Sequence, residues 1–313
     1  GAIRECHGDV HLANMLWHDG RPLLFDCIEF NDNFRCIDPI NDGAFLLMDL
    51  DDRGGSELGW RFLNRYLQQT GDYAGVALLD YYKSYRAAVR AKVTGLRLQQ
   101  PGLCREEKLR DEKLLQSYLD LALGYCQPHR HGLILTHGPS GCGKSTLVRE
   151  IAPCCGAISV HSDIERKRLY GLAATDRSDS APAEGIYTAQ AGQQTYQRLL
   201  ELAETLLMAG MPVIVDATFL GEPQRTPFFQ LAERLKLPLV ILDFLFDREQ
   251  LFQRVERRSQ QTEQISEATV EILKKQLSQV QPLTAAEEQV SIKVQPGQPA
   301  KTIAARVQAA MTG

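Results

Sequence analysis

The chain has 313 residues, of which 44% are hydrophobic and 24% are charged, with a formal net charge of -4 at pH 7. This composition is typical of a globular protein, and the length suits about two domains. The nearly balanced charge excludes a global field that would attract nucleic acid or an acidic membrane, although it leaves a local basic groove open.

The sequence has no pattern that indicates export or a membrane anchor. No apolar run approaches the roughly 20 residues that cross a bilayer. Charged residues at Arg4 and Glu5 argue against a signal peptide. The eight cysteines form no CxxC pair, so neither a zinc site nor a disulfide framework is expected. We therefore expect a cytoplasmic protein with reduced thiols.

The first 125 residues begin with short loops and continue as helices. Apolar runs at 15–17 and 23–25 predict strands on either side of a turn at Asp19 and Gly20. From about residue 57 to residue 125, apolar residues recur at helical spacing. A polar segment with Pro and Gly follows, which predicts a boundary between a domain at 1–127 and a domain at 128–313.

In the second half, β-prone runs alternate with helical stretches. The predicted strands are 133–136, 157–160, 213–215, 239–246 and 290–294. The predicted helices are 144–151, 187–209, 224–235, 248–258 and 267–279. This alternation predicts an α/β fold with a doubly wound parallel sheet of about five strands.

A phosphate-binding loop follows the first strand of this half. The segment GPSGCGKS at 138–145 fits the pattern GxxxxGK[ST] between a strand and a helix. Backbone N–H groups of such a loop point at phosphate oxygens, its Lys reaches the β- and γ-phosphates, and its hydroxyl binds Mg²⁺. The residues predicted to bind ATP are Gly138, Ser140, Gly141, Gly143, Lys144, Ser145 and Thr146, with Ser145 also on the metal.

Two acidic residues follow the next two strands. Asp163 comes after the strand at 157–160, at the edge of the sheet where α/β proteins bind ligands. There it could accept the proton of an acceptor hydroxyl, while Arg166, one helical turn on, binds the acceptor. An N-cap role for Asp163 is the alternative. Asp216 ends the strand at 213–215, where an acid orients Mg²⁺ or its water. An Asp that only hydrogen-bonds to Ser145 or to a loop backbone is the alternative.

The helix predicted at 248–258 is basic. Arg254 and Arg258 share one face at a spacing of four residues, and Arg248 and Arg257 lie nearby. Such a helix could act as a lid that brings guanidinium groups onto the transferring phosphate and excludes water. A solvated basic face is the alternative.

These motifs resemble those of small P-loop kinases related to polynucleotide kinase, gluconate kinase and chloramphenicol phosphotransferase. The matching segments are GPSGCGKST, HSDIERKRL, VIVDATFL, and RVERR followed by SEA at 266–268. The resemblance implies that Asp163 activates the acceptor, that Arg166 binds it, and that Arg254 and Arg258 are lid arginines. Acceptors in that family range from RNA ends to sugars and antibiotics, so the resemblance does not name a substrate.

A second set of polar residues lies near the N-terminus. The segment HGDVHLAN at 7–14 fits HGDxxxxN, which places Asp9 and Asn14 on one tight loop. An Asp in this pattern can take a hydroxyl proton while the Asn binds Mg²⁺. Asp26 follows a short strand and could also bind metal. The alternative is a set of polar turn residues.

This spacing resembles the catalytic core of aminoglycoside phosphotransferases, and the helices to about 125 resemble the rest of their C-lobe. Such kinases also need an N-lobe, which no residue before Gly1 provides. We therefore expect this half to be truncated and catalytically impaired, as its start without Met also suggests. With FDCIEFND and FLLMDLDDRG, the whole resembles a bacterial bifunctional aminoglycoside phosphotransferase-like and P-loop kinase protein.

The leading hypothesis from the sequence is an ATP-dependent kinase with Mg²⁺ that phosphorylates a small hydroxyl acceptor through residues 130–313. Catalysis would rest on Lys144, Asp163, Arg254 and Arg258, with Asp9 in the first half. The alternatives are a nucleotide-dependent switch without a small-molecule acceptor and a polynucleotide 5′-OH kinase, which the net charge of -4 disfavours. No membrane partner is expected, and the oligomeric state is open.

Overall fold

The computed structural model describes residues 3–174, 176, 185–259 and 270–311, with only the backbone described at 257–259. The chain divides into two compact units. The first comprises residues 1–63 and 74–129, and the second comprises residues 64–73 and 130–313. The second unit thus takes in a short segment that lies, in sequence, between the two parts of the first. Within the described residues, no helix is both long and apolar enough to span a membrane.

The first unit is mostly helical. Its short strands pair antiparallel, β1 (Arg4–Glu5) with β4 (Cys36–Ile37) and β2 (Met15–His18) with β3 (Arg21–Leu24). The β2–β3 hairpin turns at Asp19 and Gly20, which both have positive φ. The remaining elements are η1 (Leu12–Asn14), α1 (Asp32–Arg35), α2 (Pro39–Asp52), the start of α3 (Ser56–Thr70), η2 (Ala74–Leu78), α4 (Leu79–Leu98) and α5 (Arg105–Gly124).

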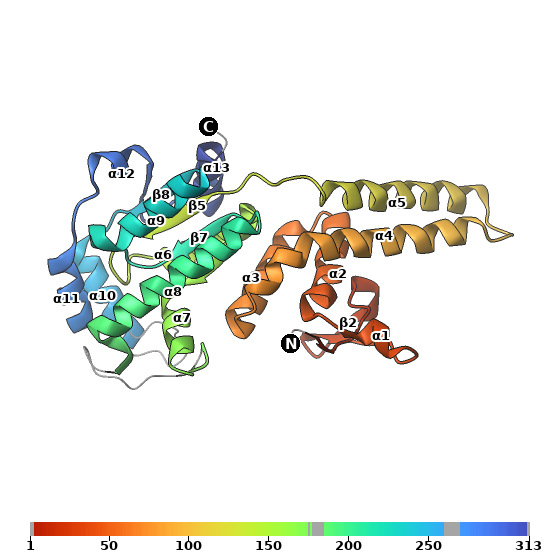
Figure 1. Ribbon diagram of the computed structural model, residues 1–313, viewed down its shortest axis with the longest axis horizontal. Helices are drawn as coiled ribbons and strands as arrows, with labels where there is room; N and C mark the ends of the chain where they lie inside the picture. The colour runs from red at the N-terminus through yellow and green to blue at the C-terminus, as the bar shows by residue number, and fades with distance from the viewer. Residues whose placement is uncertain (1–2, 175, 177–184, 260–269, 312–313) are drawn as a thin grey trace. The chain divides into compact units, whose positions relative to one another are not determined.

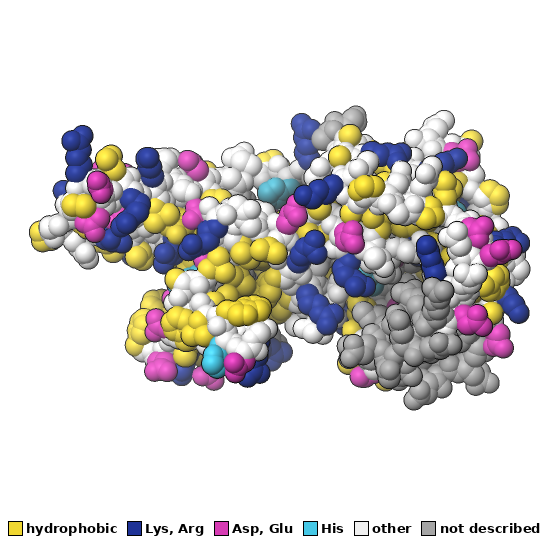
Figure 2. Space-filling model, turned by 180° about the vertical axis from the view of Figure 1, so that it is seen from behind, with side chains coloured by type: hydrophobic (Ala, Val, Ile, Leu, Met, Phe, Trp, Pro, Cys, Tyr) yellow, Lys and Arg dark blue, Asp and Glu magenta, His cyan; other side chains and the backbone are white. Residues whose placement is uncertain are grey.

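The long helices of the first unit enclose a small core. Helices α4 and α5 form an antiparallel hairpin (Figure 1). Buried residues of three helices meet there, namely Phe45 and Met48 of α2, Ala87 and Ala91 of α4, and Tyr118 of α5. Large apolar side chains also remain exposed around the short strands and α1, and Figure 2 shows hydrophobic side chains gathered on this part of the unit. They include Trp17, Leu24, Phe25, Phe30 and Phe34.

The second unit is built on a five-stranded parallel sheet, which confirms the predicted fold. The strands follow the order β6-β7-β5-β8-β9. Their bounds are β5 (Leu133–His137), β6 (Ile158–His161), β7 (Val213–Asp216), β8 (Leu239–Phe244) and β9 (Ser291–Val294). All described pairs in this sheet are parallel. Strands β5, β6 and β7 are buried throughout, as expected for strands covered on both faces.

Helices cover both faces of this sheet (Figure 1). They are α6 (Lys144–Cys154), α7 (Ser162–Leu169), α8 (Ala189–Met208), α9 (Glu222–Leu235), α10 (Arg248–Ser259), α11 (Val270–Gln279), α12 (Ala285–Gln289) and α13 (Ala300–Ala310), with the short η3 (Gly185–Tyr187). An apolar cluster of buried residues joins the sheet to α6 and α13 through residues such as Ile134, Val148 and Ile303. The predicted helix 267–279 begins outside the described residues.

The strand order decides where the polar residues of this unit meet. Strands β6, β7 and β5 are neighbours, so their carboxyl ends lie side by side at one edge of the sheet. The phosphate-binding loop follows β5, Asp216 ends β7, and Asp163 follows β6. The ends of parallel strands are where ligands bind in open α/β sheets.

Candidate functional site

The phosphate-binding loop connects β5 directly to α6. Gly143 has a left-handed conformation and caps α6, which begins at Lys144, and Ser145 and Thr146 follow in its first turn. Lys144 is 8% exposed, and its ammonium donates to the carbonyl oxygens of Gly138 and Pro139, at 2.8 and 2.7 Å. The loop is thus curled around its own lysine, with the helix N-terminus at its base.

One glycine of the loop is required by its packing. Gly141 has φ +88°, and a Cβ there would lie 2.9 Å from Cγ2 of Val255 in α10. Leu251 of the same helix lies next to this position. Helix α10 therefore packs directly on the loop, which only a residue without a side chain allows.

Asp216 is buried beside the loop. Its Oδ2 is 2.8 Å from Nδ1 of His161, and its side chain also shares a hydrogen bond with Ser145. Burial raises the pKa of Asp216, but the hydrogen bonds from His161 and Ser145 and the charge of Lys144 outweigh it, so this pKa lies below its ordinary value. The structure thus brings together Lys144, Ser145 and Asp216, the three residues predicted for the phosphates and the metal.

Asp163 lies in the first turn of α7, which starts where β6 ends, and Arg166 lies in the last turn of this helix. An Asp163 oxygen accepts from Nη1 of Arg166 at 3.2 Å, and the guanidinium carbon lies 5.2 Å from the ring centroid of Tyr187. Within the described part of the chain, Nε of Arg166 is buried and has no hydrogen-bond partner. The pair is therefore preformed and leaves a guanidinium donor for another polar group.

Tyr196 of α8 lies close to this pair, a residue that the sequence motifs do not single out. Its hydroxyl is 3.2 Å from Oγ1 of Thr218 and accepts from the backbone N–H of Phe219 at 3.1 Å. Burial raises the pKa of Tyr196. Electrostatic interactions with Asp163 and Arg166 act on the same hydroxyl. No sequence spacing links Tyr196 to either residue, so only the packing of α8 against α7 reveals it.

Of the two predicted lid arginines, only Arg254 has a side chain among the described residues. Arg254 lies on the exposed side of α10, while Leu251 and Val255 of that helix are buried. Arg258 is part of α10, but its side chain and the segment 266–268 lie outside the described residues. A neighbouring helix supplies a contact that the sequence did not predict, because Oε1 of Gln276 in α11 accepts from the backbone N–H of Ser140 at 2.8 Å.

In the first unit, Asp9 and Asn14 meet as predicted from their spacing. The Asn14 amide donates to Oδ2 of Asp9 at 2.9 Å, and His11 lies 3.2 Å from the same oxygen. Burial raises the pKa of Asp9, but the hydrogen bonds from His11 and Asn14 and the charge of Arg86 outweigh it, so this pKa lies below its ordinary value. These contacts favour an ionised Asp9.

Asp26 is connected to this loop through the backbone. The N–H of Phe25 donates to the Asn14 carbonyl at 3.1 Å, and the His7 ring is 3.0 Å from the Phe25 carbonyl oxygen. Asp26 itself is exposed, with φ +60°. Asp42 accepts from the backbone N–H groups of His7 and the next residue, which fits a structural role.

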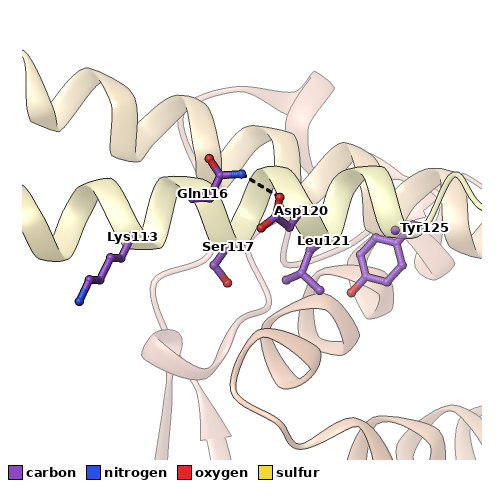
Figure 3. Close-up of a pocket in the computed structure, with 7 residues that line it drawn as sticks. Lys113, Gln116, Ser117, Asp120, Leu121 and Tyr125 are labelled. Atoms are coloured by element: carbon purple, nitrogen blue, oxygen red, sulfur yellow. Dashed lines mark hydrogen bonds between the residues drawn. The ribbon is translucent and has the colours of Figure 1, made fainter.

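A hollow of about 590 Å³ lies along α5 in the first unit (Figure 3). Its lining contains none of the residues predicted for either site and consists of Lys113, Gln116, Ser117, Asp120, Leu121, Gly124 and Tyr125. In Figure 3, the Gln116 amide donates to Asp120, at 2.8 Å. Because these residues all come from α5 and the position directly after it, the hollow lacks the convergent polar groups typical of a ligand site.

The fold and the loop define the second unit as a P-loop domain. Residues 133–283 match the family model described as AAA domain, and residues 2–79 match the model of the phosphotransferase enzyme family. The chain therefore joins a segment of the phosphotransferase enzyme family to a P-loop domain, as the sequence motifs predict. These two assignments support a phosphotransferase.

The chain is also similar to curated proteins of mycobacteria. Uncharacterised proteins of Mycobacterium tuberculosis (strains H37Rv and CDC 1551) and Mycobacterium bovis are 37% identical to it over 224 residues. The alignment covers 72% of this chain and 44% of each relative, so this chain spans less than half of their length.

Part of the chain also matches solved structures. A gluconokinase from Sinorhizobium meliloti is 20% identical, with a TM-score of 0.39, and the match covers 58% of this chain and 91% of that one. An APS kinase from Mycobacterium tuberculosis, in complex with AMPPNP and APS, is 16% identical, with a TM-score of 0.40. That match covers 59% of this chain and all of the other.

Proposed function

We propose that the second unit is an ATP-dependent kinase that transfers the γ-phosphate to a hydroxyl group of a small molecule. The observation that carries this proposal is the meeting of donor-side and acceptor-side residues at the ends of three neighbouring strands. Lys144 of the loop, Asp216 of β7, and the Asp163–Arg166 pair after β6 supply the groups that phosphoryl transfer needs.

On the donor side, the backbone N–H groups of the loop and Lys144 would hold the β- and γ-phosphates. Ser145 and Asp216 offer hard oxygen ligands next to that position, which suits Mg²⁺. Among the described residues, no group of three or more His, Cys, Asp or Glu side chains could hold a metal. A Mg²⁺ site with one carboxylate, one hydroxyl and nucleotide phosphates fits this arrangement. When bound, the ion would neutralise charge on the phosphates.

On the acceptor side, Asp163 would take the proton of the attacking hydroxyl as the new oxygen–phosphorus bond forms and ADP leaves. Arg166 would orient the acceptor through its Nε, which has no hydrogen-bond partner among the described residues. Arg254 and Arg258 would add positive charge around the phosphoryl group when the lid helix closes. A binding module that only senses nucleotide has no need for the Asp163–Arg166 pair, which is why this pair favours a kinase.

The first unit carries a further candidate in Asp9, Asn14 and Asp26. The contact between Asp9 and Asn14 supports a role in metal or acceptor binding. We assign the transfer to the second unit, where the donor and acceptor groups lie together.

Transfer of labelled phosphate from ATP to a panel of hydroxyl acceptors tests the proposal. The panel contains sugars, aminoglycosides and RNA with a free 5′-OH. With the correct acceptor, Asp163→Asn should lower transfer by about 10²–10⁴-fold, as expected for the loss of a general base. Glu222→Gln, which changes an exposed carboxylate of the same unit, should leave transfer unchanged. Acceptor-independent hydrolysis of ATP without transfer to any panel member would instead favour the nucleotide-dependent switch.

A further inference from the structure

A chain of buried hydrogen bonds leads away from Asp216. The Asp216 carboxylate bonds to Nδ1 of His161, and Nε2 of that ring is 3.1 Å from Oγ of Ser159. The Ser159 hydroxyl in turn donates to Oδ1 of Asn64 at 2.9 Å. All four residues are buried. The nucleotide site is thus linked, bond by bond, to a residue of α3 that lies in the segment 64–73 of the second unit.

Asn64 also completes the edge of the sheet. Among the described strands, β6 is the outermost in the sheet, so none of them pairs with one side of its backbone. The Asn64 amide donates to the Ala157 carbonyl at 2.9 Å and accepts from the Ser159 N–H at 2.7 Å, as a neighbouring strand would. These two bonds fix the orientation of the amide. Its oxygen is thereby directed at the Ser159 hydroxyl.

The same segment holds the helix that carries the acceptor-side pair. Arg168 of α7 donates to the Gln68 carbonyl at 2.7 Å and pairs with Glu165, which is fully buried. Gly71 has φ +74°, and a Cβ there would lie 2.8 Å from Nε of Arg168. Segment 64–73 therefore contacts both β6, next to Asp216, and α7, next to Asp163.

We propose that segment 64–73 contributes to the function of the nucleotide site. Asn64 of this segment, together with Ser159 and His161 of β6, acts as a positioning residue for the Asp216 carboxylate. This inference rests on the proposed function, because it assigns Asp216 to the Mg²⁺ of the bound nucleotide. Hydrogen bonds behind a metal-binding group fix its orientation, and their loss typically costs 10–100-fold in metal affinity or activity. The segment leaves the first unit at residue 63 and returns to it at residue 74, so the complete site includes residues outside the predicted domain at 128–313.

The competing explanation is that Asn64 only stabilises the edge of the sheet. The Ser159→Ala variant separates the two explanations. It removes the hydroxyl between Asn64 and His161 but keeps the backbone N–H and carbonyl groups that bind the Asn64 amide. Gln69→Ala is the matched control, since it truncates an exposed amide side chain of the same helix.

The test measures the affinity of the full chain for a nonhydrolysable ATP analogue by calorimetry, once with Mg²⁺ and once with EDTA. Ser159→Ala and Asn64→Ala should weaken binding with Mg²⁺ by about 10-fold and change binding in EDTA by less than about 2-fold. A purely structural role would weaken both alike or lower only the thermal midpoint. Gln69→Ala should match the wild type in both conditions.

Wild-type affinity of Ser159→Ala in the presence of Mg²⁺ would overturn the inference. If Lys144→Ala abolishes binding in that experiment, the proposed nucleotide site stands and only the role of segment 64–73 fails. If the wild-type protein does not bind the analogue at all, the proposed function fails and the inference fails with it.

Discussion

The Asp216 carboxylate, 4% exposed, accepts hydrogen bonds from two sides, from the His161 ring and the Ser145 hydroxyl. Although burial raises its pKa, these bonds and the charge of Lys144 bring the pKa below 3.8. A group whose pKa is lower in the folded than in the unfolded state stabilises the fold above the unfolded pKa, and this stabilisation is lost as the pH falls through the folded pKa.

The lowered pKa of Asp216 predicts how the stability of an Asp216→Asn variant compares with that of the wild type. The variant has no carboxylate at this position, so it lacks the stabilisation that an ionised Asp216 gives above the unfolded pKa. The difference in unfolding free energy between wild type and variant should be constant above about pH 5 and should shrink at lower pH. Urea unfolding at a series of pH values measures it. A difference that grows as the pH falls would contradict the direction of the Asp216 pKa shift.

Gly141 gives a second prediction about a single residue. Gly141→Ala adds the cost of a left-handed conformation, about 1–2 kcal/mol, to a close contact with Val255. Gly210→Ala is a suitable control, because Gly210 also has positive φ but the described residues place no atom within 4 Å of the added Cβ. Gly141→Ala should therefore be the less stable variant in urea unfolding, and equal stability of the two would show that α10 yields to the added methyl group.

Among the secondary-structure elements, an ion pair ties α12 to α9. Arg225 is fully buried, and its guanidinium binds both oxygens of Glu287, at 2.6 and 3.0 Å. Arg225 also donates to the carbonyl oxygen of Phe219, just after β7. Burial raises the pKa of Glu287, but the hydrogen bonds from Arg225 and Thr284 and the Arg225 charge lower it overall. The pair therefore holds the chain after α11 close to the end of β7.

Breaking this pair on one side should be costly. Glu287→Ala leaves the Arg225 charge buried without its partner, which should lower the unfolding free energy by about 3–5 kcal/mol. Glu288→Ala, a change at the exposed neighbouring position, should have little effect. Denaturant unfolding of the two variants measures the difference, and similar midpoints for both would contradict a stabilising role of the pair.

The strands of the second unit could be predicted because their signals are local. Buried parallel strands appear as short apolar runs, and the loop at 138–145 has a fixed spacing. Once the strands alternate with helices, the parallel sheet follows from general rules of connection, and the meeting of Asp163 and Asp216 at one edge follows from the sheet. The parallel sheet of the second unit was thus predictable because short segments of the sequence determine its strands.

The contacts around these residues could not be predicted, because they join positions far apart in the chain. Asn64 looks like any polar residue on an amphipathic helix, and only the docking of its segment brings it to Ser159. Tyr196 and Gln276 carry no motif and become relevant through helix packing and a hydrogen bond to a loop N–H. The roles of the predicted site residues, including Asp9 and Arg254, stay predictions.

For the whole molecule, the division into two units predicts how nucleotide binding is distributed along the chain. A ligand stabilises the regions that bind it, by about 2.7 kcal/mol at a concentration of 100 Kd. Hydrogen exchange with an ATP analogue and Mg²⁺ should therefore slow at 138–146 and at 64–73, while the first-unit segment 105–124 should be unchanged. Slower hydrogen exchange at 105–124 alone would contradict this prediction, because it would indicate that the nucleotide binds to the first unit.

We propose that phosphoryl transfer belongs to the P-loop unit and not to the Asp9–Asn14 loop. The most direct measurement compares transfer from labelled ATP in the Lys144→Ala and Asp9→Asn variants of the full chain, with the acceptor that the panel identifies. We predict that Lys144→Ala abolishes transfer and that Asp9→Asn retains it. Loss of transfer in Asp9→Asn together with full transfer in Lys144→Ala would contradict the claim.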